Sequence, residues 1–241
     1  DFEGTLQDAV ERHRLEVVSL RNARWDHTGS YPEAKGLHVI RDPRDIIVSA
    51  YFSHLKTHRL LNEEMKAERE RLKNLTKEEG LIAEMSGISE RTLRDLGNWH
   101  YGECAEVLEF KMEDFTARYR EHFPEVLVHF GWFQPGEDGD PWRYRLLALA
   151  NRAHRHSKGW TLFRVRQQRI SPGGLNRVLE RLSFKRLAGG RTEGEENPSS
   201  HYRKGQPGDW RNHFTPEVTA AFKEKFPGLV SKLGYEESEA W

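Results

Sequence analysis

The sequence predicts an α/β fold in which a central parallel sheet is flanked by helices, formed by a single domain over residues 1–241. Three observations support this. Short β-rich segments alternate with helical patterns, 241 residues suit one large domain, and no low-complexity linker divides the chain. Hydrophobic residues make up 36% of the chain and include seven Trp, so we expect a real core under a strongly charged surface.

The first predicted elements are a helix and two short strands. Residues 6–14 show the pattern of a charged helix, and Leu15–Leu20 contains a β-branched pair typical of a strand. After a polar turn, Gly36–Ile40 is predicted as a second strand.

A helix is predicted directly after this second strand. Apolar residues recur with helical spacing from 46 to 55. Asp42 suits the N-cap and Pro43 the first helical position, and Asp45 has the spacing of a capping box. The segment therefore predicts a strand, a tight turn and a helix.

The remainder of the chain adds one strand and several helices. Two or three amphipathic helices are expected over 60–97, with Gly80 and Gly87 as breaks. Val107–Lys111 alternates like a strand, and Glu113 with Asp114 suits the first turn of a helix that runs towards Phe130. Further helical patterns cover 142–155, 174–188 and 216–233.

Charge is balanced over the whole chain but not along it. With 38 basic and 38 acidic residues the formal net charge is zero, which excludes a globally basic nucleic-acid binder. Between Arg143 and Arg186, however, twelve Lys or Arg accompany one acid, Glu180, for a local net charge of +11. Two interpretations stay open, an anion-binding block and ordinary solvated helix faces.

No membrane span is predicted, because the chain has no run of about 18 apolar residues. The single cysteine, Cys104, fits a reducing compartment, and we expect a cytoplasmic protein.

Two segments carry residues suited to binding phosphate. In Arg41–Ser49 a helix N-terminus offers free N–H groups, with a guanidinium and a hydroxyl at its ends. The alternative is a structural salt bridge from Arg41 or Arg44 to a nearby Asp. In the second segment, 203–215, two glycines allow a positive φ beside two cations. The alternative there is a surface turn before the last helical region.

Together these segments resemble the sulfotransferases that use 3′-phosphoadenosine 5′-phosphosulfate (PAPS). Arg41-Asp-Pro-Arg-Asp-Ile-Ile-Val-Ser49 is similar to their 3′-phosphate loop, and Arg203-Lys-Gly-Gln-Pro-Gly-Asp-Trp210 is similar to their C-terminal motif. The resemblance implies a P-loop-kinase-like sulfotransferase fold, PAPS as the donor, PAP (3′-phosphoadenosine 5′-phosphate) as the product and no metal. It places the 3′-phosphate on Arg41, Ser49, Arg203, Lys204 and Gly205.

The same resemblance implies an adenine site. Leu182-Ser-Phe184 lies where the family has Thr-Ser-Phe, so Ser183 and Phe184 are expected at the donor, with a core role as the alternative for Phe184. Phe110-Lys-Met-Glu-Asp114 is similar to the family's Phe-x-Tyr-Glu-Asp. The adenine-contacting Tyr is Met112 here, a thioether that can still pack against a purine.

The general base is expected just after the strand at 15–20. His27 is the first His there, and Asp26 is the competing base, because some family branches use a carboxylate. The family's Lys-Thr before this His is Trp25-Asp26 in this chain. His38, His54 and His58 are assigned to packing or to the surface.

Three hypotheses about function follow. The first is sulfuryl transfer from PAPS to a hydroxyl or amine of a small acceptor, with no nucleic-acid partner and with a homodimer left open. The second is a non-catalytic member that binds 3′-phosphoadenosine, since the family's Pro-Lys-Ser-Gly-Thr-Thr-like 5′-phosphosulfate loop has no counterpart in residues 1–241; we expect that loop before Asp1. The third, a nucleic-acid binder using the basic block, lacks regular aromatic interleaving. The acceptor is expected on 58–100 and 155–175.

Overall fold

The computed structural model describes residues 6–13, 15, 17–30, 33–58, 63–135, 170–192, 194, 195, 197 and 205–241, with scattered positions between 142 and 153. The chain divides into two compact units, one formed by Asp1–Glu113 with Glu193–Trp241 and the other by Asp114–Thr192. The expected single domain is therefore not confirmed.

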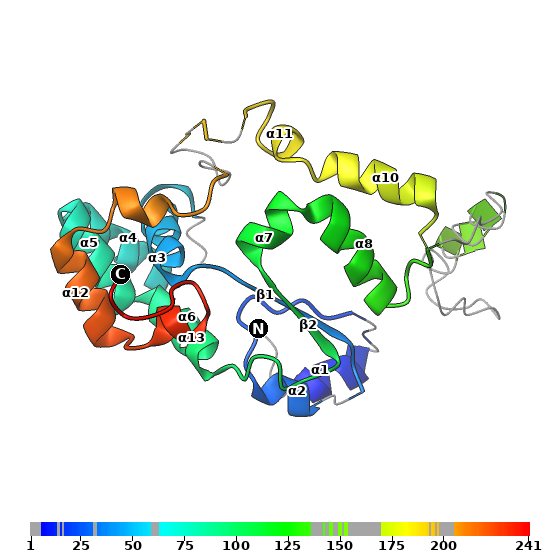
Figure 1. Cartoon of the computed structure of the whole chain (residues 1–241), viewed down its shortest axis with the longest axis horizontal. Coiled ribbons are helices and arrows are strands. Elements are labelled where there is room, and N and C mark those ends of the chain that lie inside the picture. The colour runs from blue at the N-terminus through cyan, green and yellow to red at the C-terminus, as the bar shows by residue number, and fades with distance from the viewer. Residues whose placement is uncertain are drawn as a thin grey trace. The chain divides into compact units, whose positions relative to one another are not determined.

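The first unit is mostly helical and contains a two-stranded parallel sheet (Figure 1). Its strands are β1 (Gly36–Ile40) and β2 (Val107–Lys111), in register from the pair Gly36 and Val107 to the pair Ile40 and Lys111. The helices are α1 (Leu6–His13), α2 (Asp26–Ser30), α3 (Pro43–Phe52), α4 (Glu63–Lys73), α5 (Lys77–Met85), α6 (Ile88–Asn98), α12 (Pro216–Lys225) and α13 (Leu229–Lys232), with a π-helical turn, η1 (Ser53–Thr57), and a 3-10 turn, η2 (Asp209–Asn212). β2 runs directly into α7 (Met112–Ala117).

The core of this unit lies between α3, α5, α6, α12 and α13, which form one group of helices in Figure 1. Side chains from four of these helices are fully buried, namely Ile47, Leu81, Leu93, Val218 and Phe222. A buried residue of β1, Ile40, belongs to the same cluster. The turn between β1 and α3 is thereby anchored at both ends by packed elements.

The start of α3 is as predicted, with one difference. The Asp42 carboxylate accepts a hydrogen bond from the Arg44 N–H at 2.9 Å, and Pro43 occupies the first turn. Asp45 does not complete a capping box, because its carboxylate bonds to a distant segment. The backbone N–H of Asp42 instead donates to Glu113 Oε1 at 2.9 Å.

The predicted strand at Leu15–Leu20 is wrong. Its described residues, all but Glu16, form neither strand nor helix, and Val17 is 63% exposed. A β-branched pair favours extended backbone, but a strand exists only where a neighbour satisfies its N–H and C=O groups. Within the described residues the sheet has only β1 and β2, and neither pairs with this segment.

Gly80 is not a helix break, although it was expected to be one. It lies inside α5, where a Cβ atom would be 2.5 Å from Cε2 of Tyr51 on α3. The missing side chain lets the two helices approach closely. Gly87 does separate two helices, as the N-cap of α6.

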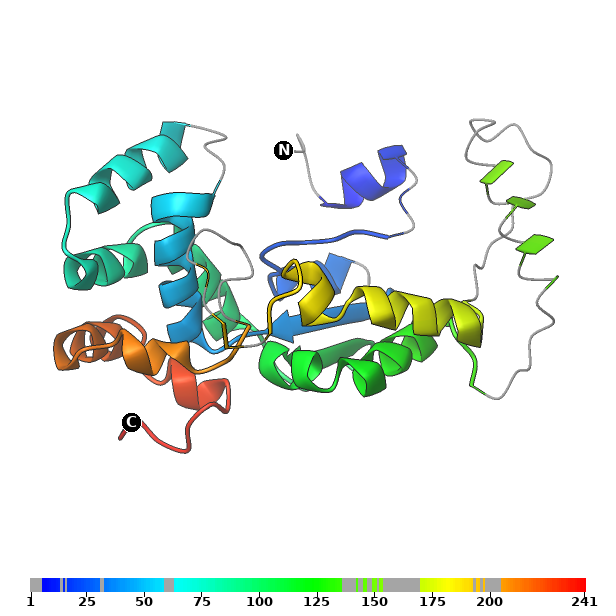
Figure 2. The same ribbon diagram turned by 90° about the horizontal axis from the view of Figure 1, so that it is seen from above.

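The second unit packs α8 (Tyr119–His129) against α10 (Pro172–Arg181), which lie side by side in Figure 2. Its small core consists of Leu127, Leu175 and Leu179. A short helix, α11 (Phe184–Leu187), follows α10. The helices predicted over 174–188 and between Glu113 and Phe130 are thus confirmed, whereas most of 142–155 lies outside the described residues.

Over the residues that the structure describes, every helix is too short or too polar to cross a bilayer.

Candidate functional site

Arg41 occupies the turn between β1 and α3, where the helix presents its free N–H groups. The residue is half-buried, and its Nε is buried with no hydrogen-bond partner among the described residues. Buried guanidinium nitrogens are normally satisfied. An anion on Arg41 would supply the missing acceptor, so this atom fits the phosphate predicted here.

Ser49, the other end of the first phosphate segment, lies one helical turn beyond Asp45 on α3 and is half-buried. Residues four apart share a face of a helix, so Asp45 and Ser49 are neighbours on one side of α3. The Ser49 hydroxyl makes no hydrogen bond to the part of the chain that the structure describes. It is therefore available to a ligand.

Asp45 joins the two predicted phosphate segments. One carboxylate oxygen accepts a hydrogen bond from the Gly208 N–H at 2.7 Å, and the other accepts one from the Trp210 N–H at 2.8 Å. The residue is 1% exposed. Burial raises the pKa of Asp45, while the charge of Arg41 and the two N–H bonds oppose that shift. The spacing of Asp45 suggested a capping box, and nothing in the local sequence pointed to a partner 163 residues away.

Arg44 has a structural role, as the salt-bridge alternative proposed. Its guanidinium forms two hydrogen bonds with Asp42, at 2.9 and 2.7 Å, and one with Glu236 at 2.8 Å. It also lies over the rings of Trp210, at 3.8 Å from the centroid, and Trp241, at 4.6 Å. The described contacts of the Arg44 guanidinium are all with protein groups. Of the two arginines in this turn, Arg41 is therefore the one with a nitrogen that has no described partner.

Glu113 is a second acid that links distant segments. Besides accepting from Asp42, its carboxylate accepts a hydrogen bond from the Tyr235 hydroxyl at 2.8 Å. Burial and the Glu113 charge raise the pKa of Tyr235. Glu113 thus positions the N-cap residue of α3 and also lies in the first turn of α7. The sequence predicted only the second of these roles.

The C-terminal segment is a glycine-rich turn followed by a short 3-10 helix. Gly205 and Gly208 have φ values of +69° and +77°, in the region that favours glycine, as the sequence predicted. Thr215 caps α12 by accepting a hydrogen bond from the Val218 N–H at 3.2 Å. Arg203 and Lys204, the two predicted cations of this motif, lie outside the described residues.

The candidate base His27 lies at the start of α2 and is half-buried. Its Nδ1 accepts a hydrogen bond from the Arg24 N–H at 3.0 Å, which assigns the proton of the neutral ring to Nε2. Burial and the Arg24 charge lower the pKa of His27 and favour the neutral form that a base requires.

Asp26, the competing base, pairs with the Arg24 guanidinium at 3.1 Å through both oxygens. These hydrogen bonds lower the pKa of Asp26, which makes it a weaker proton acceptor. Both candidates are therefore unprotonated at neutral pH, and His27 is the stronger proton acceptor of the two because the ordinary pKa of His is higher than that of Asp.

The predicted adenine residues belong to the second unit. Ser183 is the N-cap of α11 and donates a hydrogen bond from its hydroxyl to the Glu180 carbonyl at 3.0 Å. Phe184 is half-buried. In the first unit, Met112 occupies the start of α7 and is also half-buried.

Residues 162–234 match the sulfotransferase domain family. Over these residues the chain is similar to sulfotransferases. The matched residues, less than a third of the chain, include the predicted adenine residues and the C-terminal phosphate motif, whereas Arg41 and Ser49 lie outside them. No curated protein matches the chain.

One buried polar cluster of the first unit was not predicted. The fully buried Glu84 on α5 accepts a hydrogen bond from Ser89 at 2.5 Å, and both its oxygens lie 3.0 Å from His54 Nδ1. His54 belongs to the π-helical turn after α3, so the cluster ties α3, α5 and α6 together. Sequence spacing assigned His54 to packing or to the surface but gave no signal for its acidic partner.

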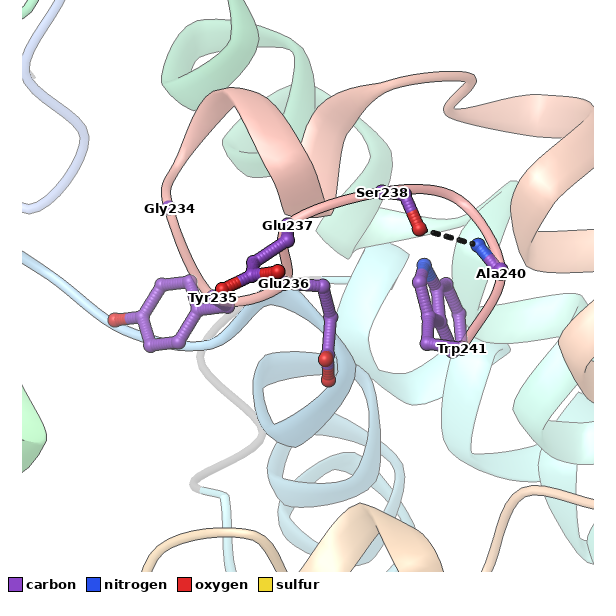
Figure 3. A pocket seen from close by; sticks show the side chains of 7 residues that line it. All are labelled: Gly234, Tyr235, Glu236, Glu237, Ser238, Ala240 and Trp241. Carbon is purple, nitrogen blue, oxygen red and sulfur yellow. Dashed lines mark hydrogen bonds between the residues drawn. The ribbon is translucent and has the colours of Figure 1, made fainter.

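A shallow pocket of about 580 Å³ lies at the C-terminal segment of the chain (Figure 3). It is lined by Gly234, Tyr235, Glu236, Glu237, Ser238, Ala240 and Trp241. Three of these side chains already contact Glu113 or Arg44. None of the predicted site residues lines it, so we assign this pocket to the support of α3 rather than to substrate.

Among the described residues of the chain, no group of three or more His, Cys, Asp or Glu side chains is arranged to hold a metal ion.

Proposed function

We propose that this protein is a sulfotransferase that uses PAPS as its donor and transfers the sulfuryl group to a hydroxyl or amine of a small-molecule acceptor. The observation that carries the proposal is the pair of hydrogen bonds from Gly208 and Trp210 to Asp45, which unite the segments similar to the family's two 3′-phosphate motifs. The second of these segments also lies inside the matched residues.

The 3′-phosphate is assigned to Arg41, Ser49, Arg203, Lys204 and Gly205. The unpartnered Nε of Arg41 supports the first of these assignments, and the positive φ of Gly205 supports the last. Guanidinium forks and free backbone N–H groups are the donors that phosphate oxygens prefer. Ser183 and Phe184 are assigned to the adenosine half of the donor.

In the proposed reaction the acceptor oxygen or nitrogen forms a bond to sulfur while the bond between sulfur and the 5′-phosphate oxygen breaks. PAP leaves with the bonding electron pair, and the acceptor's proton passes to a base. We assign this base to His27, with Asp26 as the alternative. Because the lone pair of His27 bonds to the Arg24 N–H, accepting the proton at Nε2 requires the other tautomer and the loss of that hydrogen bond.

The donor assignment is tested by calorimetric titration of PAP into the wild-type protein and Arg41→Ala. We expect the substitution to weaken PAP binding by about tenfold or more, because a charged hydrogen-bond donor to phosphate is lost. Arg91→Ala is the matched control, since Arg91 is 71% exposed and lies 3.9 Å from its acidic neighbour Asp95. Equal PAP affinity in wild type and Arg41→Ala would contradict the assignment.

The base assignment is tested by transfer of labelled sulfate in an acceptor screen, with His27→Gln and Asp26→Asn compared at saturating donor. Loss of a general base lowers kcat by about 10²–10⁴-fold. We expect that loss for His27→Gln alone, with PAP affinity unchanged. If Asp26→Asn shows the larger loss, the carboxylate is the base.

The second candidate function is a non-catalytic protein that binds 3′-phosphoadenosine. The use of the His27 lone pair by Arg24 and the pairing of Asp26 with Arg24 favour it. The labelled-sulfate transfer assay distinguishes the two functions. A binding-only protein retains PAP affinity that depends on Arg41 but transfers no label to any acceptor.

We also propose a cytoplasmic location and a small-molecule acceptor, with a homodimer left open. The location is supported by the lone Cys104, which is a free thiol. The acceptor is assigned to the helices that follow α3, namely α4, α5 and α6, and to 155–175, most of which lies outside the described residues.

A further inference from the structure

Asp45 is a carboxylate with an unusual set of partners. It is buried in the first turn of α3, and its two oxygens bind two backbone N–H groups of residues 205–210, hereafter the C-terminal turn. Gly208, with positive φ, immediately precedes η2, and Trp210 belongs to η2. The Trp210 ring also packs on Arg44, so this contact and the two hydrogen bonds together hold the turn at the start of α3.

The charge balance around Asp45 adds a second observation. Burying a carboxylate is costly unless hydrogen bonds and a counter-charge offset the cost. The nearby charge that favours the ionised form of Asp45 is that of Arg41. The same acid therefore interacts with the predicted phosphate-binding cation of the first segment and with the backbone of the second.

We propose that Asp45 is the positioning residue of the donor site. Its carboxylate holds the C-terminal turn against the start of α3, so that both segments bind the same 3′-phosphate. This inference rests on the proposed function. It assigns Asp45 no contact with the donor. Its role is to set the position of the groups that make contact.

Specificity for the 3′-phosphate is the property that should follow from this role. A ligand without that phosphate does not bind to both segments at once. Its affinity should therefore not change when Asp45 is substituted. Adenosine 5′-phosphate is such a ligand and differs from PAP only in lacking the 3′-phosphate. The ratio of the two dissociation constants thus reports on the positioning and not on the fold in general.

Asp45→Asn is the decisive substitution. An amide has one acceptor oxygen, so it can keep one of the two N–H bonds but not both. We expect the preference for PAP over adenosine 5′-phosphate, measured by calorimetry, to fall by about tenfold or more. We also expect the amide protons of Gly208 or Trp210 to exchange with solvent faster in the unliganded variant.

Glu84→Gln is the matched control. Glu84 is also a fully buried, hydrogen-bonded acid of the first unit, and its contacts are with His54 and Ser89 rather than with either phosphate segment. This variant should be destabilised yet keep the wild-type preference for PAP. A general loss of stability is thereby separated from a loss of positioning.

The outcomes distinguish the two proposals. A wild-type preference for PAP that persists in Asp45→Asn overturns the role of Asp45 and leaves the donor assignment intact. An equal fall of the preference in Asp45→Asn and Glu84→Gln also overturns it. A wild-type protein that does not discriminate PAP from adenosine 5′-phosphate overturns the proposed function, and this inference with it.

Discussion

The guanidinium of Arg44 lies 3.8 Å from the centroid of the Trp210 ring, although the two residues are separated by most of the chain. Arg44 is 1% exposed and is also hydrogen-bonded to Asp42 and Glu236. The start of α3, the 3-10 turn and the C-terminal segment therefore meet at one buried cation. This contact and the Asp45 hydrogen bonds both hold the C-terminal turn against the start of α3.

Replacing Arg44 should have a large effect on stability. Arg44→Ala would leave the buried Asp42 carboxylate without its counter-ion, and breaking a buried pair in this way costs about 3–5 kcal/mol. Arg44→Lys keeps the charge but loses the planar fork that bonds Asp42 and stacks on Trp210, so an intermediate loss is expected. Urea denaturation measures both values. A wild-type midpoint for Arg44→Ala would refute the structural role of the cation.

Gly80 should resist substitution by alanine. In an ordinary helix the change would stabilise by about 1 kcal/mol, but here the new Cβ would lie 2.5 Å from the Tyr51 ring. Overpacking costs about 1–3 kcal/mol, so we expect net destabilisation in thermal or urea unfolding.

Gly97→Ala on α6 provides the comparison, since its Cβ would meet Leu229 at an ordinary 3.4 Å. That variant should be neutral or more stable. Equal effects at the two positions would show that helix propensity, and not the contact with Tyr51, governs Gly80.

The stability of the protein should fall with pH below about 6.5, partly through His38. His38 is buried in β1 against Trp99, with ring centroids 3.8 Å apart, and burial lowers its pKa in the folded protein. The unfolded chain then takes up the proton first as the pH falls, so stability is full above the unfolded pKa and is lost between that value and the folded one. One such group contributes at most about 1.4 kcal/mol per pH unit.

The measurement is the free energy of unfolding at pH 7.5, 6.5 and 5.5 for wild type and His38→Leu. The variant should lose less stability over this range, because the residue that takes up a proton on unfolding is gone. If the two curves are parallel, His38 does not contribute to the acid sensitivity.

His54 and Glu84 should show strong energetic coupling. His54→Ala leaves the fully buried Glu84 carboxylate with Ser89 as its remaining described side-chain partner and should be strongly destabilising. Adding Glu84→Gln removes the uncompensated charge, so the double variant should lose less stability than the two single losses combined. The expected coupling energy is about 0.5–3 kcal/mol. Additive losses would mean that the pair does not act as a unit.

The parts of this fold that depend on neighbouring residues in the chain were predictable. The bounds of β1 matched because a short, mostly apolar segment ends at a charged turn, and the start of α3 matched because an N-cap and an N1 proline act within one turn. The residues proposed to bind phosphate were found in the same way, as short motifs at fixed spacing.

Features that depend on distant partners were not predictable from local patterns. Leu15–Leu20 has the composition of a strand, but pairing decides whether a strand exists, and among the described residues no neighbour pairs with it. From its local sequence Gly80 is expected to interrupt a helix. In the fold it lies within a helix, where its missing side chain leaves room for the Tyr51 ring.

Asp45 is the clearest case. Its sequence neighbours make it a helix-capping acid, whereas its two hydrogen bonds run to Gly208 and Trp210. Composition and motifs thus predicted which residues bind a phosphate-rich donor. Only the tertiary structure decided the partners of the acids Asp45 and Glu113. A buried carboxylate bonds to whichever N–H groups packing brings within reach.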